Sequence, residues 1–143
     1  MDKEAVGKTA SPTVLVVEDN QDNRELAAKI LKTNGYKVIE AVDGEEAVEK
    51  TRSERPDLIL MDLSIPKIDG YEVTRRLKGS DESKDIPVIA CTAHAMKGDI
   101  EDVLAAGCDG YIPKPIDVRQ LSNQINRFLH TAYRERVNFL VFI

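Results

Sequence analysis

The sequence predicts an α/β fold, a three-layer sandwich in which a parallel β-sheet lies between two layers of helices. Short runs rich in valine, isoleucine and leucine alternate along the chain with segments whose apolar residues recur at helical spacing. Continuous apolar runs are typical of strands that are buried on both faces of a parallel sheet. Five repeats of strand then helix indicate right-handed crossovers between neighbouring strands.

Five segments are predicted to be strands. Three of them are strongly apolar and two are weaker: residues 14–17, 58–61 and 88–91, then residues 37–40 and 110–112. Between them, apolar side chains form two helical stripes: Leu26, Ala27, Ile30 and Leu31 in the first, and Val103, Leu104 and Ala106 in the other.

Glycines and pairs of acidic residues predict where several helices begin and end. Gly35 and Gly107 stand where helices are expected to end. Two acid pairs fit the capping box at a helix start, in which each side chain bonds a free N–H group of the other residue. These pairs are Asp43 with Glu46 and Asp69 with Glu72, and we assign Asp43 and Asp69 to capping alone.

Length and composition predict a single domain with flanking segments. The chain has 143 residues, 31 % of them charged, and we expect a flexible start over residues 1–12, a domain over 13–130 and a tail over 131–143. A net charge of −5 without a basic tract argues against direct nucleic-acid binding. No apolar run is long enough to span a membrane, and Cys91 and Cys108 are not expected to pair. These features predict a cytoplasmic protein.

Polar side chains follow four of the predicted strands. Glu18 and Asp19 come after the first strand, Asp62 after the third, Thr92 after the fourth and Lys114 after the fifth. In an open α/β sheet the working site lies beyond the carboxyl ends of the strands. We therefore expect three carboxylates, a hydroxyl and an ammonium to meet at one edge of the sheet.

That combination of groups predicts phosphoryl chemistry. Carboxylates crowded together repel one another unless a cation joins them, and Mg²⁺ is the hard cation that binds a few carboxylates while keeping room for phosphate oxygens. A carboxylate is also a nucleophile towards phosphorus. Lys114 and Thr92 would place positive charge and a hydroxyl donor against the transferred group, which spreads negative charge over its oxygens.

The combined motif resembles the receiver domain of two-component response regulators over most of the chain, about residues 13–129. The residues that carry the resemblance are Val-Val-Glu18-Asp19-Asn20, Met-Asp62-Leu-Ser-Ile-Pro66-Lys-Ile-Asp69-Gly70, Thr92-Ala93 and Lys114-Pro115. The resemblance implies a flavodoxin-like fold with strand order 2-1-3-4-5.

The resemblance also implies a phospho-acceptor and its metal ligands. Asp62 would accept the phosphoryl group, and Mg²⁺ would be held by Glu18, Asp19, Asp62 and the backbone carbonyl of Ser64. Glu18 is a mild departure, because many members of the family carry Asp there. Its longer side chain is expected to alter the metal geometry without abolishing binding.

The remaining implied roles concern the response to phosphorylation. Thr92 and Lys114 would contact the phosphoryl oxygens, and Tyr111 would turn inward when Thr92 moves. The fourth helix, fifth strand and fifth helix would form the signalling face, and the Lys114–Pro115 peptide bond would be cis. We interpret His94 as a rim residue that modulates hydrolysis.

The implied partners are a histidine kinase or a histidine phosphotransfer protein, and an unknown downstream protein. Two contexts stay open: a stand-alone response regulator, favoured by the initiating Met and the residues that follow it, and a receiver from a hybrid histidine kinase, favoured by the stretch Thr-Ala-His-Ala-Met. A phosphatase with an aspartate nucleophile is an alternative from another class. That chemistry usually needs a second acid two residues on, where this chain has Ser64.

The C-terminal tail is not explained by the family pattern. Neither Gly nor Pro occurs from residue 118 to residue 143, and one apolar stripe continues through Leu121, Ile125, Leu129, Tyr133, Val137 and Leu140. We predict that the tail extends the last helix, which should begin near Asp117. Two interpretations stay open: a frayed end, and a homodimer that buries the tail.

Overall fold

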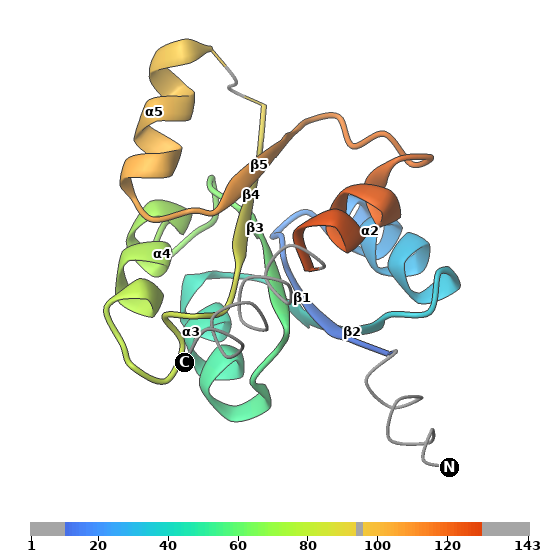
Figure 1. The fold of residues 1–143 in the computed structure, drawn as a ribbon, viewed down its shortest axis with the longest axis horizontal. Helices are drawn as coiled ribbons and strands as arrows, with labels where there is room; N and C mark the ends of the chain where they lie inside the picture. Colours follow the sequence, from blue (N-terminus) through green and yellow to red (C-terminus); the bar gives the residue numbers. More distant parts are fainter. Residues whose placement is uncertain (1–10, 94–95, 130–143) are drawn as a thin grey trace, which may run out of the picture.

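The computed structural model describes residues 11–93 and 96–129, and it confirms the predicted alternation of strands and helices (Figure 1). The strands are β1 (Thr13–Val17), β2 (Lys37–Ala41), β3 (Leu58–Asp62), β4 (Val88–Thr92) and β5 (Gly110–Pro113). The helices are α2 (Gln21–Thr33), α3 (Gly44–Glu54), α4 (Gly70–Lys78) and α5 (Lys97–Ala105), followed by a final, unlabelled helix over 121–129. Each strand starts and ends within one residue of its prediction.

The strands form one five-stranded sheet in the order β2-β1-β3-β4-β5, and every neighbouring pair is parallel. This is the order that the resemblance implied. Because parallel neighbours cannot be joined by a tight turn, each connection crosses a face of the sheet as a helix. The order reverses between β1 and β3, which places the expected site at the carboxyl ends of those two strands.

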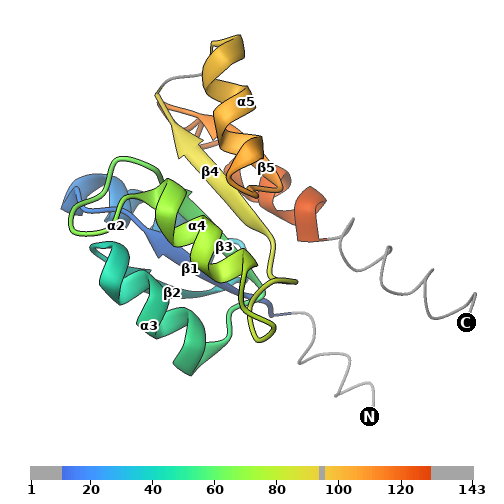
Figure 2. The same cartoon turned by 90° about the vertical axis from the view of Figure 1, so that its left-hand side faces the viewer.

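Helices cover both faces of the sheet. In Figures 1 and 2, α2 and the final helix lie on one side, and α3, α4 and α5 lie on the other. Alternate strand residues serve the two layers, since successive side chains point to opposite faces. Leu15, Val17, Ile59 and Met61 pack with α3, α4 and α5, while Val14, Val16, Leu58 and Leu60 pack with α2 and the final helix.

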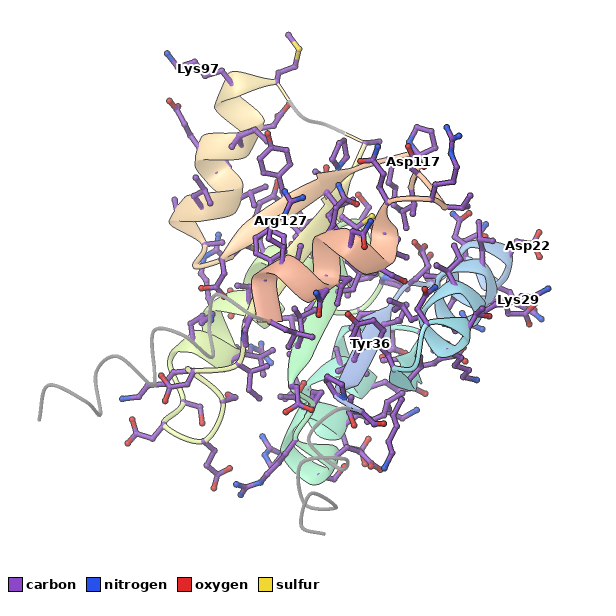
Figure 3. The ribbon with its side chains drawn as sticks, turned by 45° about the vertical axis from the view of Figure 1, so that its right-hand side comes forward. Asp22, Lys29, Tyr36, Lys97, Asp117 and Arg127 are labelled. Carbon is purple, nitrogen blue, oxygen red and sulfur yellow. The ribbon has the colours of Figure 1, made fainter. Side chains whose placement is uncertain are left out.

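The layer made by α2 and the final helix also contains a polar contact. The Tyr36 hydroxyl donates to the Ser122 carbonyl at 3.5 Å, and Figure 3 shows the Tyr36 side chain beside these two helices. Asp22 and Lys29 point outward from α2 in the same view. The outer surface of this helix is therefore charged, and its inner surface is apolar.

The predicted caps at the starts of α3 and α4 are confirmed for the aspartates but not for the glutamates. The side chains of Asp43 and Asp69 are N-caps, accepting from the N–H groups of Glu46 and Glu72 at 2.9 Å each. The reciprocal half of the capping box is wrong in both helices. Glu46 accepts from the N–H of Val42, one residue before the cap, and Glu72 pairs with two arginines of its own helix.

Two members of the predicted apolar stripes are not in the core. Leu26 and Leu104 are exposed, whereas Ala27, Leu31 and Val103 in the same helices are buried. Leu26 and Leu104 each adjoin a buried residue in sequence, and a helix turns about 100° per residue, so they lie at the edge of the stripe. Gly35 and Gly107 follow the ends of α2 and α5 with positive φ, as the sequence predicts.

The final helix begins after a turn at Asp117, whose carbonyl accepts from the Leu121 N–H at 3.1 Å. The predicted start near Asp117 is therefore the turn, and the helix itself begins at Leu121. Most of the predicted flexible N-terminus and the whole tail over 131–143 lie outside the described residues, so both stay predictions. Within the described ranges, no helix has the length and apolar character needed to cross a membrane.

Candidate functional site

The carboxyl ends of β1, β3, β4 and β5 bring the predicted polar residues to one edge of the sheet. Asp62 is the last residue of β3 and lies in register with Cys91 of β4. Thr92, the last residue of β4, lies in register with Pro113, directly before Lys114. The strands therefore deliver side chains that are far apart in sequence to adjacent positions.

Three carboxylates cluster at this edge. One oxygen from each of Glu18, Asp19 and Asp62 lies within 4.8 Å of the others. Glu18 and Asp62 are buried, and Asp19 is exposed. The cluster therefore combines two buried acids with one acid that is open to solvent.

The turn from β1 into α2 shapes the first half of the cluster. The Glu18 N–H donates to the Ala41 carbonyl at 3.0 Å, which extends the pairing of β1 with β2 by one residue. The Asn20 N–H donates to Glu18 Oε2 at 3.2 Å, and the Asn20 side chain caps α2 by accepting from the Asn23 N–H. Asn20, rather than Asp19, is therefore the cap, which leaves Asp19 available to a cation.

The loop after β3 orients the acceptor carboxylate. The Ser64 N–H donates to Asp62 Oδ1 at 3.0 Å. The Gly70 N–H donates to the Leu63 carbonyl at 3.1 Å, which brings the start of α4 against the loop. A Cβ atom at Gly70 would lie 2.7 Å from Leu63 Cα and 2.8 Å from the Asp62 carbonyl oxygen, so only glycine fits there.

Lys114 bridges the two buried acids. Its Nζ atom lies 3.1 Å from Glu18 Oε1 and 3.3 Å from Asp62 Oδ2. The Lys114 N–H donates to the Thr92 carbonyl at 2.8 Å, and the Lys114–Pro115 bond is cis, as the resemblance implied. The ammonium group therefore offsets part of the negative charge in the cluster.

Burial and charge shift two pKa values in the cluster. Burial raises the pKa of the Glu18 carboxyl, and the neighbouring Asp62 carboxyl raises it further. Burial disfavours the charged form of Lys114, but the contacts with Glu18 and Asp62 outweigh it and raise the pKa of the ammonium above its ordinary value. Lys114 therefore stays charged beside acids that repel each other.

The donor set fits Mg²⁺. Hard cations bind carboxylate oxygens, and Mg²⁺ commonly takes one or a few of them while keeping waters and phosphate oxygens as its other ligands. Glu18, Asp19 and Asp62 offer oxygens close enough to share one ion, and the exposed side of Asp19 leaves an approach from solvent. The acidic cluster is thus consistent with a magnesium site of the kind that the sequence predicted.

The other predicted residues have mixed placements. Thr92 is buried at the end of β4. Tyr111 of β5 is 40 % exposed and lies in register with Ala90, two residues before the end of β4. His94 lies outside the described residues, and its modulating role stays a prediction.

Sequence reasoning missed two basic residues that contact the site loops. Arg24 donates through Nη1 to the Glu18 carbonyl at 3.0 Å. Lys67, in the loop after Asp62, has a positive φ of 71° and pairs with Asp43 at 3.3 Å. No helical or strand periodicity marks either residue, and the positive φ of Lys67 is visible only in the structure.

Comparisons with known proteins agree with this geometry. The family model described as the response regulator receiver domain matches residues 14–126. Over 120 residues the chain is 46 % identical to the polar-differentiation response regulator DivK of Brucella anthropi, an alignment that covers 84 % of this chain and 98 % of that protein.

Solved structures show the same likeness. The receiver domain of sensor histidine kinase PA1611 from Pseudomonas aeruginosa superposes with a TM-score of 0.78 at 36 % identity, covering 85 % of this chain and 99 % of that chain. That structure has a magnesium ion coordinated in its active-site cleft. The chemotaxis response regulator CheY4 of Vibrio cholerae superposes with a TM-score of 0.78 at 27 % identity, over 82 % of this chain and 98 % of that one.

Proposed function

Because the chain belongs to the family of response regulator receiver domains, we propose that Asp62 accepts a phosphoryl group from a phosphohistidine. The family acts in two-component phosphorelays, which makes a histidine kinase the implied phosphodonor. A histidine phosphotransfer protein is the other candidate donor. The observation that carries the assignment to Asp62 is its position at the end of β3, buried between a second acid and the ammonium of Lys114.

Each residue of the site has a role in this transfer. Glu18, Asp19, Asp62 and the Ser64 carbonyl would hold Mg²⁺, which when bound supplies positive charge to the phosphoryl oxygens. An oxygen of Asp62 attacks phosphorus while the bond from phosphorus to the imidazole nitrogen breaks. The imidazole leaves with that electron pair and takes a proton from solvent.

The transferred group brings its own negative charge into the cluster. Lys114 lies close enough to Asp62 to turn its ammonium from the carboxylates to the phosphoryl oxygens. Thr92, at the end of the neighbouring strand, would donate its hydroxyl to the same oxygens. Tyr111 would then move inward and remodel the face made by α5, β5 and the final helix.

The context of the domain has two candidates. The chain covers 98 % of the DivK sequence that it resembles, and this favours a stand-alone response regulator. A receiver of a hybrid kinase is the alternative, because the PA1611 receiver is also similar. A cytoplasmic location stays part of the proposal.

The phosphatase alternative is less well supported. Ser64 stands two residues after Asp62, and its N–H group donates to the carboxylate that would be the nucleophile. A serine there supplies no general acid for a leaving group at neutral pH.

A homodimer through residues 131–143 remains part of the proposal. Leu121 and Ile125, the first residues of the apolar stripe, are fully buried against the sheet, and the stripe beyond Leu129 lies outside the described residues. Sedimentation of the full chain and of a version ending at His130 tests this. If both versions are monomeric at tens of micromolar, the dimer hypothesis is wrong.

The test of phosphorylation is incubation with Mg²⁺ and acetyl phosphate, followed by intact mass. We expect one added phosphoryl group, no addition when the metal is chelated, and none in Asp62→Asn. Asp22→Asn, on the exposed face of α2, is the matched control and should be labelled like the wild type. Labelling that persists in Asp62→Asn would contradict the assignment.

A further inference from the structure

We propose that the end of β2 and the turn into α3, residues 40–45, position both loops of the acidic cluster. The inference rests on the proposed function, because the loops that are positioned carry the residues proposed to hold Mg²⁺ for phosphoryl transfer. None of the three clustered carboxylates comes from this turn. Its contacts nevertheless reach the loop after β1 and the loop after β3.

The loop after β1 is held through both backbone groups of Glu18. Its N–H donates to the Ala41 carbonyl at 3.0 Å, and its carbonyl accepts from Arg24 Nη1 at 3.0 Å. The same guanidinium pairs through Nε with Glu40 Oε1 at 3.0 Å. One planar cation thus joins the metal-binding turn to the edge strand, a geometry that suits Arg and that a Lys point charge cannot reproduce.

The pair of Arg24 and Glu40 also sets the charge around the cluster. The Arg24 side chain is only 14 % exposed, so solvent screens it weakly. An uncompensated guanidinium beside Glu18 would oppose a divalent cation. Glu40 neutralises that charge while leaving the hydrogen bond to Glu18 in place.

The loop after β3 is held at the start of α3. The Gly44 N–H donates to the Pro66 carbonyl at 3.2 Å, and a Cβ atom at Gly44 would overlap the Ile68 carbonyl oxygen. Lys67 Nζ lies 3.3 Å from Asp43 Oδ2 and 3.5 Å from Glu45 Oε1.

The backbone contacts are the stronger part of this second attachment. Lys67 is more than half exposed, so its ion pairs add little free energy by themselves. The close approach of Gly44 to the loop cannot be kept with a larger residue. Residues 40–45 therefore fix the distance between the loop after β1 and the loop after β3. This distance sets the separation of Glu18 from Asp62 and Ser64.

The test measures Mg²⁺ binding directly, by NMR titration, together with melting temperature and the rate of labelling by acetyl phosphate. Arg24→Gln should weaken Mg²⁺ binding about tenfold, the lower end of what outer contacts of metal sites commonly contribute. Its labelling should slow at limiting Mg²⁺ and recover at saturating Mg²⁺, because the reacting groups are unchanged. Arg24→Lys should recover only part of the affinity.

Gly44→Ala should weaken Mg²⁺ binding by displacing the loop after β3. If that variant does not fold, Arg24→Gln and Arg24→Lys decide the inference by themselves, because the exposed Lys67 ion pairs are too weak to test the attachment of the loop after β3. The matched control for Arg24→Gln is Arg76→Gln, because the Arg76 guanidinium pairs with Glu72 on the surface of α4. The matched control for Gly44→Ala is Gly98→Ala, because a Cβ atom at Gly98 meets nothing within 4 Å. Both controls should bind Mg²⁺ like the wild type.

The outcomes separate this inference from the proposed function. If the wild type neither binds Mg²⁺ nor is labelled, the proposed function is wrong. The positioning role of residues 40–45 is wrong if the wild type binds Mg²⁺ and is labelled, but Arg24→Gln and a folded Gly44→Ala bind Mg²⁺ as tightly as the controls. A loss of affinity with an unchanged melting temperature supports it.

Discussion

Lys114 and Glu18, which stand near opposite ends of the domain sequence, form an ion pair with 3.1 Å between Nζ and Oε1. Mg²⁺ and Lys114 therefore compete for the same carboxylate. Replacing Lys114 with Met should tighten Mg²⁺ binding about three- to tenfold, because a competing cation leaves the cluster. The same variant should be labelled more slowly by acetyl phosphate, since the charge that meets the phosphoryl oxygens is gone.

Titration calorimetry with Mg²⁺ checks the first effect. Lys97→Met, at the start of α5, is the control, because this lysine is exposed and Figure 3 shows its side chain pointing outward from the helix. Unchanged or weaker Mg²⁺ binding in Lys114→Met would show that the ion pair does not compete with the metal.

Tyr111 reports on the state of the switch. Its side chain is 40 % exposed, although its neighbour in β5, Ile112, is buried. With Mg²⁺ and beryllofluoride bound, we expect the ring to lose exposure as Thr92 moves towards the phosphoryl mimic. The measurement is the NMR signals of the two side chains with and without beryllofluoride, and unchanged signals at both residues would contradict the coupling.

Asp43 links the stability of α3 to pH. Its hydrogen bond from the Glu46 N–H, and then its contact with Lys67, lower the pKa of its carboxyl. A group with a lowered pKa in the folded state stabilises the protein above its unfolded pKa, and that contribution is lost as the pH falls through the folded value. Asp43→Ala should therefore reduce the free energy of unfolding by about 1 kcal/mol at pH 7, and by less in acid.

Urea unfolding of Asp43→Ala and wild type at pH 7 and pH 3 measures both parts. Asp43→Asn keeps an acceptor for the Glu46 N–H and should lose less stability at pH 7. A difference between Asp43→Ala and wild type that grows in acid would contradict the sign of this argument.

The two thiols should be unreactive in the folded protein. Both cysteines are buried and free, and burial raises the pKa of the Cys91 thiol to about 12 and that of Cys108 above its ordinary value. At pH 8 the Cys91 thiol should carry on the order of a thousandfold less thiolate than a free cysteine. A thiol-exchange reagent should therefore react slowly with the native protein and release two equivalents after unfolding. Fast reaction of the native protein would mean that the core opens readily.

The strands and the cluster could be predicted from the sequence for a physical reason. A strand buried on both faces must be apolar along its length, so the polar residue at its end stands out, as Asp62 does after residues 58–61. Parallel strands then bring such ends together whatever their distance in sequence. The residues themselves therefore predicted the cluster of Glu18, Asp19 and Asp62.

The contacts of residues 40–45 could not be predicted in the same way. They depend on backbone carbonyls, such as those of Glu18 and Pro66, which every residue carries and no pattern marks. The exposure of Leu26 was missed because spacing alone does not show which edge of a stripe meets the sheet. The order of the strands came from the resemblance, since periodicity does not order a sheet.

The place of the final helix also matters for how the protein is made. Leu121 and Ile125 close over Val14, Leu58 and Ile89, residues of the first, third and fourth strands. Until the final helix has left the ribosome, a nascent chain that already holds every strand keeps part of one apolar face of its sheet bare, where chaperones or other chains can bind it. Translation that stops between β5 and residue 121 would release such a chain, and we expect that product to aggregate rather than to signal.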